Sequence, residues 1–248
     1  MSYLENNEAF LGTGDRNSKG QTLEEFLAAY NPKKYDCPSN TVDILIFRKP
    51  MDPNMNEAKA ANASFMKPKL KLLLVRRSNH PSIGFWATPG GFVNLHETLR
   101  DAAARELQEE TGVKGLPLAE LRTWDDPERD PRWRVITTSF VSLIEGDQPI
   151  KAGDDAADAA WFEVSLDKIS EESEVNSLIE TYSIHLDCSE RDLHLSAEAT
   201  RTIKKIGCFT ETSYAVLKKD SIAVDHPLLI LDAWLYIQKC ANANCSAS

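Results

Sequence analysis

Hydrophobic residues along the chain come in short runs separated by polar, turn-forming stretches. Residues 41–47 read TVDILIF, an apolar and β-branched run of the length of a buried strand, and residues 70–75 form a second such run. The segment between them, 49–66, has the composition of a loop, so the two runs are expected to pair as a hairpin. Residues 135–144 and 159–164 have the same apolar character. These four runs predict four strands.

A different, helical pattern predicts an α-helix from about Thr98 to Thr111. Thr98 can cap its first turn, and Gly112 suits the left-handed position that follows the last turn. Its apolar positions share one face of the helix: Leu99, Ala103 and Leu107. That face is expected to pack against the sheet.

Three carboxylates project from another face of the same helix. Glu106, Glu109 and Glu110 are three and four positions apart, so their anions repel one another unless a cation lies between them. Oxygen ligands select hard cations, which predicts Mg²⁺ or Mn²⁺. Arg105 precedes Glu109 by four residues and can orient it, and the turn at 89–91 lets the backbone approach a metal or phosphate. A solvated acidic face is the alternative.

The spacing across residues 91–113, GFVNLHETLRDAAARELQEETGV, favours the metal site over a solvated face. This segment resembles the Nudix box, the signature of Nudix hydrolases. The resemblance implies an α/β (α+β) fold, the Nudix α/β/α sandwich with a mixed central sheet, and cleavage of a nucleoside diphosphate linked to another group. It also implies roles for box residues. Metal ligands are expected at Gly91, through its carbonyl region, and at Glu106, Glu109 and Glu110, while Arg105 and Glu97 are expected to orient them.

An arginine-rich stretch, RDPRWR at residues 129–134, suggests a phosphate clamp, because the guanidinium fork matches phosphate geometry. An exposed charged turn is the alternative. The stretch resembles the loop of ADP-ribose pyrophosphatases and of NrtR regulators, although Trp133 stands where a glycine is common there. Arg129 and Arg132 are the expected substrate-binding residues. The resemblance to this branch extends over residues 25–48, 70–164 and 222–236.

Other candidate site residues lie outside the box. Arg77 and Trp86 are expected to form the substrate-side wall, where the indole either stacks on adenine or packs in the core; core packing is favoured for Phe92. A carboxylate in the loop AGDDAAD at 152–158 is expected to act as a further metal ligand or general base. Asp155 is chosen for the catalytic set, with three alternatives: Asp154, Glu145 and Asp158. A turn capped by aspartates is the other explanation of this loop.

Composition fits a globular enzyme. Of 248 residues, 42% are hydrophobic and 27% charged, and the net charge of −10 disfavours a broad nucleic-acid surface. The five cysteines contain no Cys-x-x-Cys pair, so neither a disulfide framework nor a zinc site is indicated. No basic leader and no run of about 18 apolar residues is present, which predicts a cytoplasmic protein without membrane contact.

The expected organisation is an N-terminal extension at 1–37, a Nudix domain at 38–170 and a C-terminal extension at 171–248. A short helix is expected at 22–30. Within the C-terminal extension, strands are expected near 182–186 and 213–217. An apolar helix follows at 222–238, and the tail from 241 is expected to be disordered. The helix carries enough apolar surface to require burial, against its own chain or a second subunit, and a homodimer is predicted.

The pattern therefore predicts a Mg²⁺-dependent pyrophosphohydrolase that cleaves ADP-ribose to AMP and ribose 5-phosphate. A pyrophosphohydrolase of another nucleoside diphosphate or triphosphate derivative is the first alternative. An NrtR-like regulator that senses ADP-ribose and binds DNA is the second, and it is disfavoured because about 12 residues after Tyr236 are too few for a winged helix. The expected partner is a small nucleoside diphosphate substrate, with no nucleic acid bound.

Overall fold

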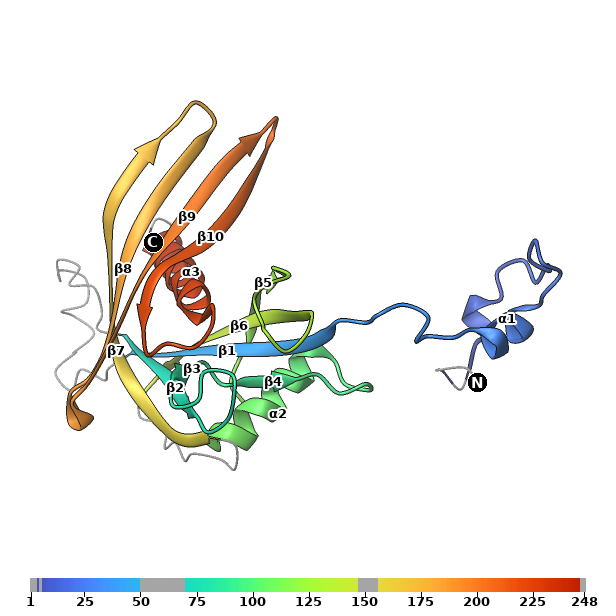
Figure 1. Ribbon diagram of the computed structural model, residues 1–248, viewed down its shortest axis with the longest axis horizontal. Helices are drawn as coiled ribbons and strands as arrows, with labels where there is room; N and C mark the ends of the chain where they lie inside the picture. The colour runs from blue at the N-terminus through green and yellow to red at the C-terminus, as the bar shows by residue number, and fades with distance from the viewer. Residues whose placement is uncertain (1–3, 5, 50–69, 147–155, 246–248) are drawn as a thin grey trace. The chain divides into compact units, whose positions relative to one another are not determined.

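The computed structural model describes residue 4 and residues 6–49, 70–146 and 156–245 (Figure 1). It comprises two compact units, Met1–Pro38 and Ser39–Ser248. The first contains a short 3₁₀ helix, η1 (Glu8–Phe10), and the helix α1 (Leu23–Ala29). Thr22 caps α1, because its hydroxyl accepts the Glu25 N–H while the Glu25 carboxylate accepts the Thr22 N–H. The helix predicted at 22–30 is confirmed.

The second unit is built on a mixed sheet with the strand order β10-β9-β8-β7-β2-β1-β6-β5; β3 pairs with β2, and β4 with β1. Its strands are β1 (Ser39–Lys49), β2 (Lys71–Arg77), β3 (Trp86–Ala87), β4 (Gly90–Phe92), β5 (Ala119–Trp124), β6 (Val135–Glu145), β7 (Ala156–Ser173), β8 (Ser177–Cys188), β9 (Leu193–Ile206) and β10 (Phe209–Asp220). A 3₁₀ turn, η2 (Ser189–Arg191), joins β8 to β9. β1 runs parallel to β6 and antiparallel to β2, as the predicted hairpin requires.

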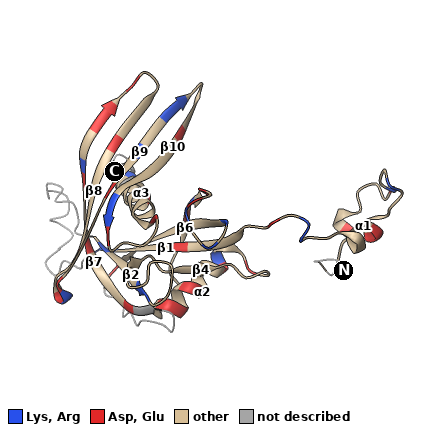
Figure 2. Cartoon of the chain, viewed as in Figure 1, with Lys and Arg blue, Asp and Glu red and all other residues tan. Residues whose placement is uncertain are grey.

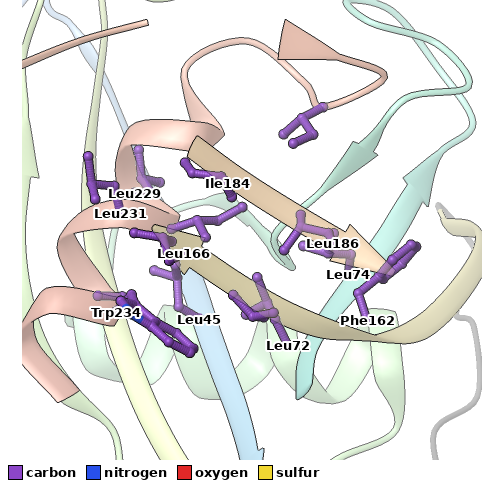
Figure 3. Close-up of a cluster of buried hydrophobic side chains, with 14 of the residues drawn as sticks. Leu45, Leu72, Leu74, Phe162, Leu166, Ile184, Leu186, Leu229, Leu231 and Trp234 are labelled. Atoms are coloured by element: carbon purple, nitrogen blue, oxygen red, sulfur yellow. The ribbon is translucent and has the colours of Figure 1, made fainter. Parts of the chain in front are cut away.

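Two helices cover opposite faces of this sheet (Figure 1). Alternate residues of β1 point to opposite sides. Val42, Ile44 and Ile46 pack with α2 (Leu99–Thr111), and Leu45 and Phe47 pack with α3 (His226–Cys245). Figure 3 shows the second cluster, in which Trp234 of α3 lies among side chains of β1, β2, β7 and β8. The predicted sandwich of helix, mixed sheet and helix is confirmed.

The C-terminal part of the chain continues the same sheet. Strands predicted near 182–186 and 213–217 are present as parts of β8 and β10, whereas β9 was not predicted. The division expected at residue 170 falls inside β7, which extends to Ser173. α3 begins at His226 and continues to Cys245, so the disordered tail predicted from residue 241 is wrong as far as residue 245. No helix in the described ranges is both long and apolar enough to cross a membrane.

The sheet curls around α3 so that its two outermost strands, β5 and β10, exchange side-chain contacts. Arg122 of β5 donates to the Thr212 carbonyl of β10 at 3.3 Å and pairs with Asp232 of α3 at 3.4 Å. The rings of Trp124 and Tyr214 lie 5.5 Å apart, and the Tyr214 hydroxyl donates to Asp232 at 2.5 Å. One arginine therefore connects both outer strands to the helix between them.

Candidate active site

The carboxylate-bearing helix α2 is fixed at both ends as the sequence predicts. The Thr98 hydroxyl accepts the Asp101 N–H at 3.2 Å, and Gly112 ends the helix with a φ of 75°. Three of its side chains are buried against the sheet: Ala102, Ala103 and Leu107. The acidic residues lie elsewhere on the helix (Figure 2), so their positions are set by a rigid element.

Arg105 is the hub of the acidic cluster. It binds Glu97 through two nitrogens at 3.0 and 2.7 Å, and its Nη1 donates to Glu106 at 2.7 Å and to Glu109 at 2.9 Å. Its Nη2 also donates to the Phe92 carbonyl at 2.9 Å. The hydrogen bonds from Arg105 lower the pKa of Glu97 to about 2. The arginine thus ties the loop before α2 to the helix and offsets part of the negative charge.

Glu106 packs directly on the backbone of Gly91. A Cβ at Gly91 would lie 2.4 Å from the Glu106 carboxyl carbon, so no larger residue fits without moving that carboxylate. Burial raises the pKa of Glu106, against the lowering effect of Arg105. The spacing of Gly91 and Glu106 therefore has a steric basis as well as a chemical one.

Glu110 is the carboxyl of the cluster whose pKa is raised furthest. Its Oε2 accepts the Gly90 N–H at 2.9 Å. Burial, together with the negative charges of Glu106 and Asp43, raises the pKa of Glu110 to about 7 in spite of the lowering effect of the Gly90 N–H. Glu109 differs, because its side chain is 56% exposed and is held by Arg105. The structure therefore brings Glu106 and Glu110 together beside the glycine turn and leaves Glu109 at the rim.

These residues suit a hard divalent cation. Within the described ranges, no three His, Cys, Asp or Glu side chains already form a metal-binding group. Mg²⁺ needs less than that, because it is commonly held by one or two carboxylates and completes its shell with water and substrate phosphate. Glu106 and Glu110 match that requirement. Both carboxylates are half-buried beside the backbone at Gly91, and each raises the free-energy cost of a negative charge on the other.

A pocket of about 460 Å³ opens beside the carboxylates. Its walls include Glu106, Glu110 and Gly91 from the box and the three arginines expected to bind substrate: Arg77, Arg129 and Arg132. Part of the predicted metal-binding set and all three predicted arginines therefore meet in one cavity, whereas Glu109 and Trp86 do not line it. Residues far apart in the sequence form the rest of it, among them Asp43 of β1 and His226 of α3.

The three arginines differ in their surroundings. Arg77 is half-buried, donates its Nε–H to the Pro81 carbonyl at 2.7 Å, and has a pKa lowered first by burial and then by the positive charge of Arg132. Arg132 forms a two-point pair with Asp130 at 3.0 and 2.7 Å. Arg129 forms another with Asp225 at 2.9 and 3.0 Å, and its side chain is only 7% exposed. Arg77 and Arg132 are thus two cations that repel each other in the pocket.

A buried polar cluster forms the base of the pocket, and sequence analysis missed it. Asp43 accepts hydrogen bonds from the hydroxyls of Thr88 at 3.1 Å and Thr137 at 2.7 Å. His226 lies 3.9 Å from Asp43, and Arg129 lies 4.0 Å from it. A signal was available, since Asp43 is the one acidic residue in the apolar run TVDILIF and Asp225-His226 directly precedes an apolar helix.

Of the two aromatic residues near the box, Trp86 takes the second of its two expected places, and Phe92 lies where it was not expected. Trp86 is 4% exposed and packs edge-on against Phe162 with the ring centroids 4.9 Å apart, so it belongs to the core. Phe92, for which core packing was favoured, is 47% exposed and lines the pocket. The Arg132 guanidinium lies 5.3 Å from the centroid of its ring. The aromatic surface of the pocket is therefore supplied by Phe92, and the core-packing interpretation of Phe92 is wrong.

The candidates for a further carboxylate are only partly described. Asp154 and Asp155 lie outside the described residues. Asp158 pairs with Arg191 at 2.5 Å, and Glu145 pairs with Lys49 at 3.5 Å at the end of the sheet strands. Both described carboxylates are therefore engaged by cations of their own.

Known proteins resemble this chain in sequence and in fold. Residues 57–176 match the NUDIX domain. A crystal structure of a MutT/nudix family protein from Enterococcus faecalis superposes with a TM-score of 0.60 at 30% identity, over 88% of this chain and 70% of that one. The two chains therefore share a fold. The chain belongs to the Nudix family.

Two curated relatives carry functional names. An ADP-ribose pyrophosphatase of Methanocaldococcus jannaschii is 42% identical over 95 residues, 38% of this chain and 56% of that protein. The ADPR responsive transcriptional repressor NtrR of Acinetobacter baylyi is 34% identical over 123 residues, 49% of this chain and 43% of the repressor. The chain thus spans about half the length of each.

Proposed function

We propose that this protein is a divalent-metal-dependent pyrophosphohydrolase that cleaves ADP-ribose to AMP and ribose 5-phosphate. One observation carries the proposal: Glu106 and Glu110 share a single pocket with Arg77, Arg129 and Arg132. Hydrolysis of a diphosphate needs both metal ligands and groups that bind phosphate, and the pocket contains both. The 42% identity to an archaeal ADP-ribose pyrophosphatase supports the choice of substrate.

Glu106 and Glu110 would hold Mg²⁺ or Mn²⁺ together with the backbone at Gly91, and Glu109 would reach it from the rim. The chemistry that such an ion supplies when bound is charge neutralisation of the diphosphate and acidity for the attacking water. Arg105 orients Glu106 and Glu109 through the hydrogen bonds from its Nη1. Asp155 is retained as the proposed general base, on the basis of the sequence alone.

The arginines of the pocket would bind the diphosphate. Burial and the repulsion from Arg132 both raise the free energy of the charged Arg77. A dianionic group between the two arginines would offset both effects. Arg129 is already paired with Asp225, which favours a supporting role for it at the base of the pocket. Arg132 has its charge compensated by Asp130 and presents a planar group beside Phe92. We assign adenine stacking to Phe92 in place of Trp86.

A substrate panel tests this function. ADP-ribose, NADH, diadenosine polyphosphates and damaged nucleoside triphosphates are incubated with protein and Mg²⁺, and the products are separated by chromatography. AMP and ribose 5-phosphate from ADP-ribose, at the highest kcat/KM of the panel, are the expected result. Preferential hydrolysis of a triphosphate would instead select the alternative substrate class.

A variant of the metal-binding cluster tests the mechanism. Glu110→Gln is expected to keep the fold while kcat falls about 100-fold or more, which corresponds to about 2.7 kcal/mol of activation free energy. Glu128→Gln, an exposed glutamate outside the pocket, is the control and should retain wild-type kcat. Wild-type kcat for Glu110→Gln at saturating Mg²⁺ would remove this carboxylate from the mechanism.

The identity to the Acinetobacter baylyi repressor favours a second candidate function, an ADP-ribose sensor that acts on DNA. The net charge of −10 opposes binding to a polyanion. We expect no shift of duplex DNA at physiological salt, with or without ADP-ribose. A shift that depends on ADP-ribose, combined with no turnover of it, would establish the sensor instead.

A homodimer and a cytoplasmic location complete the proposal. α3 no longer supports the dimer, because Leu229, Ile230 and Leu231 are fully buried within their own chain. Support comes instead from exposed apolar side chains on and between the C-terminal strands: Ile169, Val175, Ile206, Phe209 and Leu217. Light scattering at micromolar concentration should give a mass near twice 27.7 kDa, and a mass near 27.7 kDa would exclude the dimer.

A further inference from the structure

His226 is a buried histidine at the first position of α3, and its ring reaches the turn that precedes the metal-binding glycines. Its Nδ1 accepts the backbone N–H of Thr88 at 3.1 Å and lies 2.9 Å from the Thr88 hydroxyl. Because a backbone N–H can only donate, Nδ1 carries no proton, and the proton of the neutral ring is on Nε2. Burial lowers the pKa of His226, which favours this neutral form.

Thr88 is held from two sides. Its hydroxyl also lies within hydrogen-bond distance of Asp43 Oδ1, at 3.1 Å, so the strand β1 and the helix α3 both contact it. The next residue, Pro89, accepts the Ile44 N–H at 2.8 Å. Gly90 follows, and its N–H is donated to Glu110 at 2.9 Å. A continuous path of short contacts therefore leads from His226, through Thr88 and the turn, to Glu110.

The turn has little freedom to adjust elsewhere. A Cβ at Gly90 would lie 2.2 Å from the Val42 carbonyl oxygen, and one at Gly91 would lie 2.4 Å from the Glu106 carboxyl. Both glycines are thus pressed between β1 and α2. A displacement of Thr88 would be passed on to the two carboxylates, because the intervening backbone is closely packed.

We propose that His226 is a positioning residue for the metal site: by accepting the Thr88 N–H it fixes the Gly90–Gly91 turn, and with it Glu106 and Glu110. The proposal rests on the metal assignment made above, not on the identity of the substrate. Docking of α3 does not require an imidazole, since Leu229, Ile230 and Leu231 are already fully buried. Burial of a polar ring costs free energy unless the ring forms hydrogen bonds, and the His226 ring forms its hydrogen bond with the turn proposed to bind metal.

Two variants of His226 separate positioning from packing. His226→Asn places an amide oxygen near the position of Nδ1 and can accept the Thr88 N–H, whereas His226→Leu fills space without accepting. Mn²⁺ affinity of the full-length proteins is measured by electron paramagnetic resonance of the free ion, together with Tm, kcat and KM. Substitution of a residue that orients metal ligands typically weakens metal binding by about 10- to 100-fold. We therefore expect His226→Leu to bind Mn²⁺ at least about tenfold more weakly than wild type.

The controls distinguish the outcomes. His226→Asn should bind Mn²⁺ with an affinity within about threefold of wild type. Ile230→Val should lower Tm and leave the Mn²⁺ affinity unchanged. If His226→Leu does not fold, His226→Gln takes its place, since its amide oxygen extends past Thr88 towards the position of Nε2. The proposal would be overturned if His226→Asn bound Mn²⁺ no more tightly than His226→Leu or its substitute His226→Gln. It would also be overturned if the wild-type protein bound no Mn²⁺. Wild-type protein that binds Mn²⁺ but does not hydrolyse ADP-ribose would contradict only the substrate assignment.

Discussion

At the scale of single residues, the glutamates of the box have opposite electrostatic environments. Glu97 is held by two nitrogens of Arg105, which lowers its pKa to about 2, whereas burial raises the pKa of Glu110 to about 7. Glu106 is shifted in the same direction as Glu110. The Glu97 carboxylate is thus stabilised as an anion by Arg105, whereas the protein alone compensates poorly for negative charge on Glu106 and Glu110, the carboxylates proposed to bind metal.

The raised pKa of Glu110 predicts how stability depends on pH without metal. A carboxyl with an ordinary pKa of 4.5 and a folded pKa of about 7 favours folding in its protonated form. Its contribution is complete below pH 4.5 and is lost as pH rises through 7, roughly 3 kcal/mol in all. In EDTA, the free energy of unfolding of wild type should therefore fall more between pH 5 and 8 than that of Glu110→Gln. Parallel curves from urea denaturation would contradict this.

Phe92 offers a second prediction at this scale. Stacking of a base on an aromatic ring contributes about 1–3 kcal/mol, so Phe92→Leu should weaken AMP binding roughly 5- to 150-fold. Calorimetry should show ribose 5-phosphate binding unchanged, because that product has no base. Phe92→Tyr is the matched control and should bind AMP like wild type. Equal losses for AMP and ribose 5-phosphate would show that Phe92 shapes the pocket without contacting the base.

At the scale of elements, the box helix and the strands beside it could be predicted, and the contributions of α3 could not. The cap at Thr98, the turn at Gly112 and the apolar face at Leu107 are local signals, and each appears in the structure as expected. The His226 ring accepts a hydrogen bond from the backbone N–H of Thr88, which lies 138 positions away along the chain. A local sequence pattern cannot predict that contact. The sequence left the place of Trp86 open and the interpretation of Phe92 was wrong for a related reason: burial of an aromatic ring depends on which distant element covers it.

The junction of α3 with the arginine loop gives a prediction for this scale. Arg129 and Asp225 form a buried pair, and removing one partner of such a pair typically costs about 3–5 kcal/mol. Asp43, 4.0 Å from Arg129, retains part of the compensation. Asp225→Ala should therefore lower the free energy of unfolding by about 3 kcal/mol in urea titrations.

An exposed pair serves as the control for this measurement. Glu190 lies 3.9 Å from Lys71 and is largely exposed, so Glu190→Ala should change stability by less than about 1 kcal/mol. Equal effects of the two substitutions would mean that the Arg129–Asp225 pair adds nothing beyond an ordinary surface contact.

At the scale of the whole second unit, the sheet is held in its curl by contacts that are not backbone hydrogen bonds. Arg122 lies 5.7 Å from the ring centroid of Trp124 and 5.2 Å from that of Tyr214, in addition to its pairing with Asp232. Among the strands that the structure describes, β10 pairs with β9 alone, so its other edge depends on these side chains. The sequence offered no sign of this arrangement, because β5 and β10 are far apart along the chain.

Arg122 should accordingly control the opening of β10. A cation–π contact contributes about 0.5–2 kcal/mol, so the loss of one such contact in Arg122→Ala is expected to speed hydrogen exchange of the β10 amides roughly 2- to 30-fold. Amides of β1 at the centre of the sheet should exchange at their wild-type rates. Mass spectrometry of peptides from the two strands makes the comparison. Acceleration of both strands alike would indicate global destabilisation and contradict a local role.

The contact between Thr88 and His226 also has a consequence in time. The two residues are 138 positions apart, and ribosomes add about 5–20 residues per second, so roughly 7–28 s pass between their synthesis. Once Glu110 has been added, early in that interval, the nascent chain contains every carboxylate of the box but not the ring that contacts Thr88. Under the positioning role proposed for His226, the proposed metal site reaches this geometry only after α3 has left the ribosome.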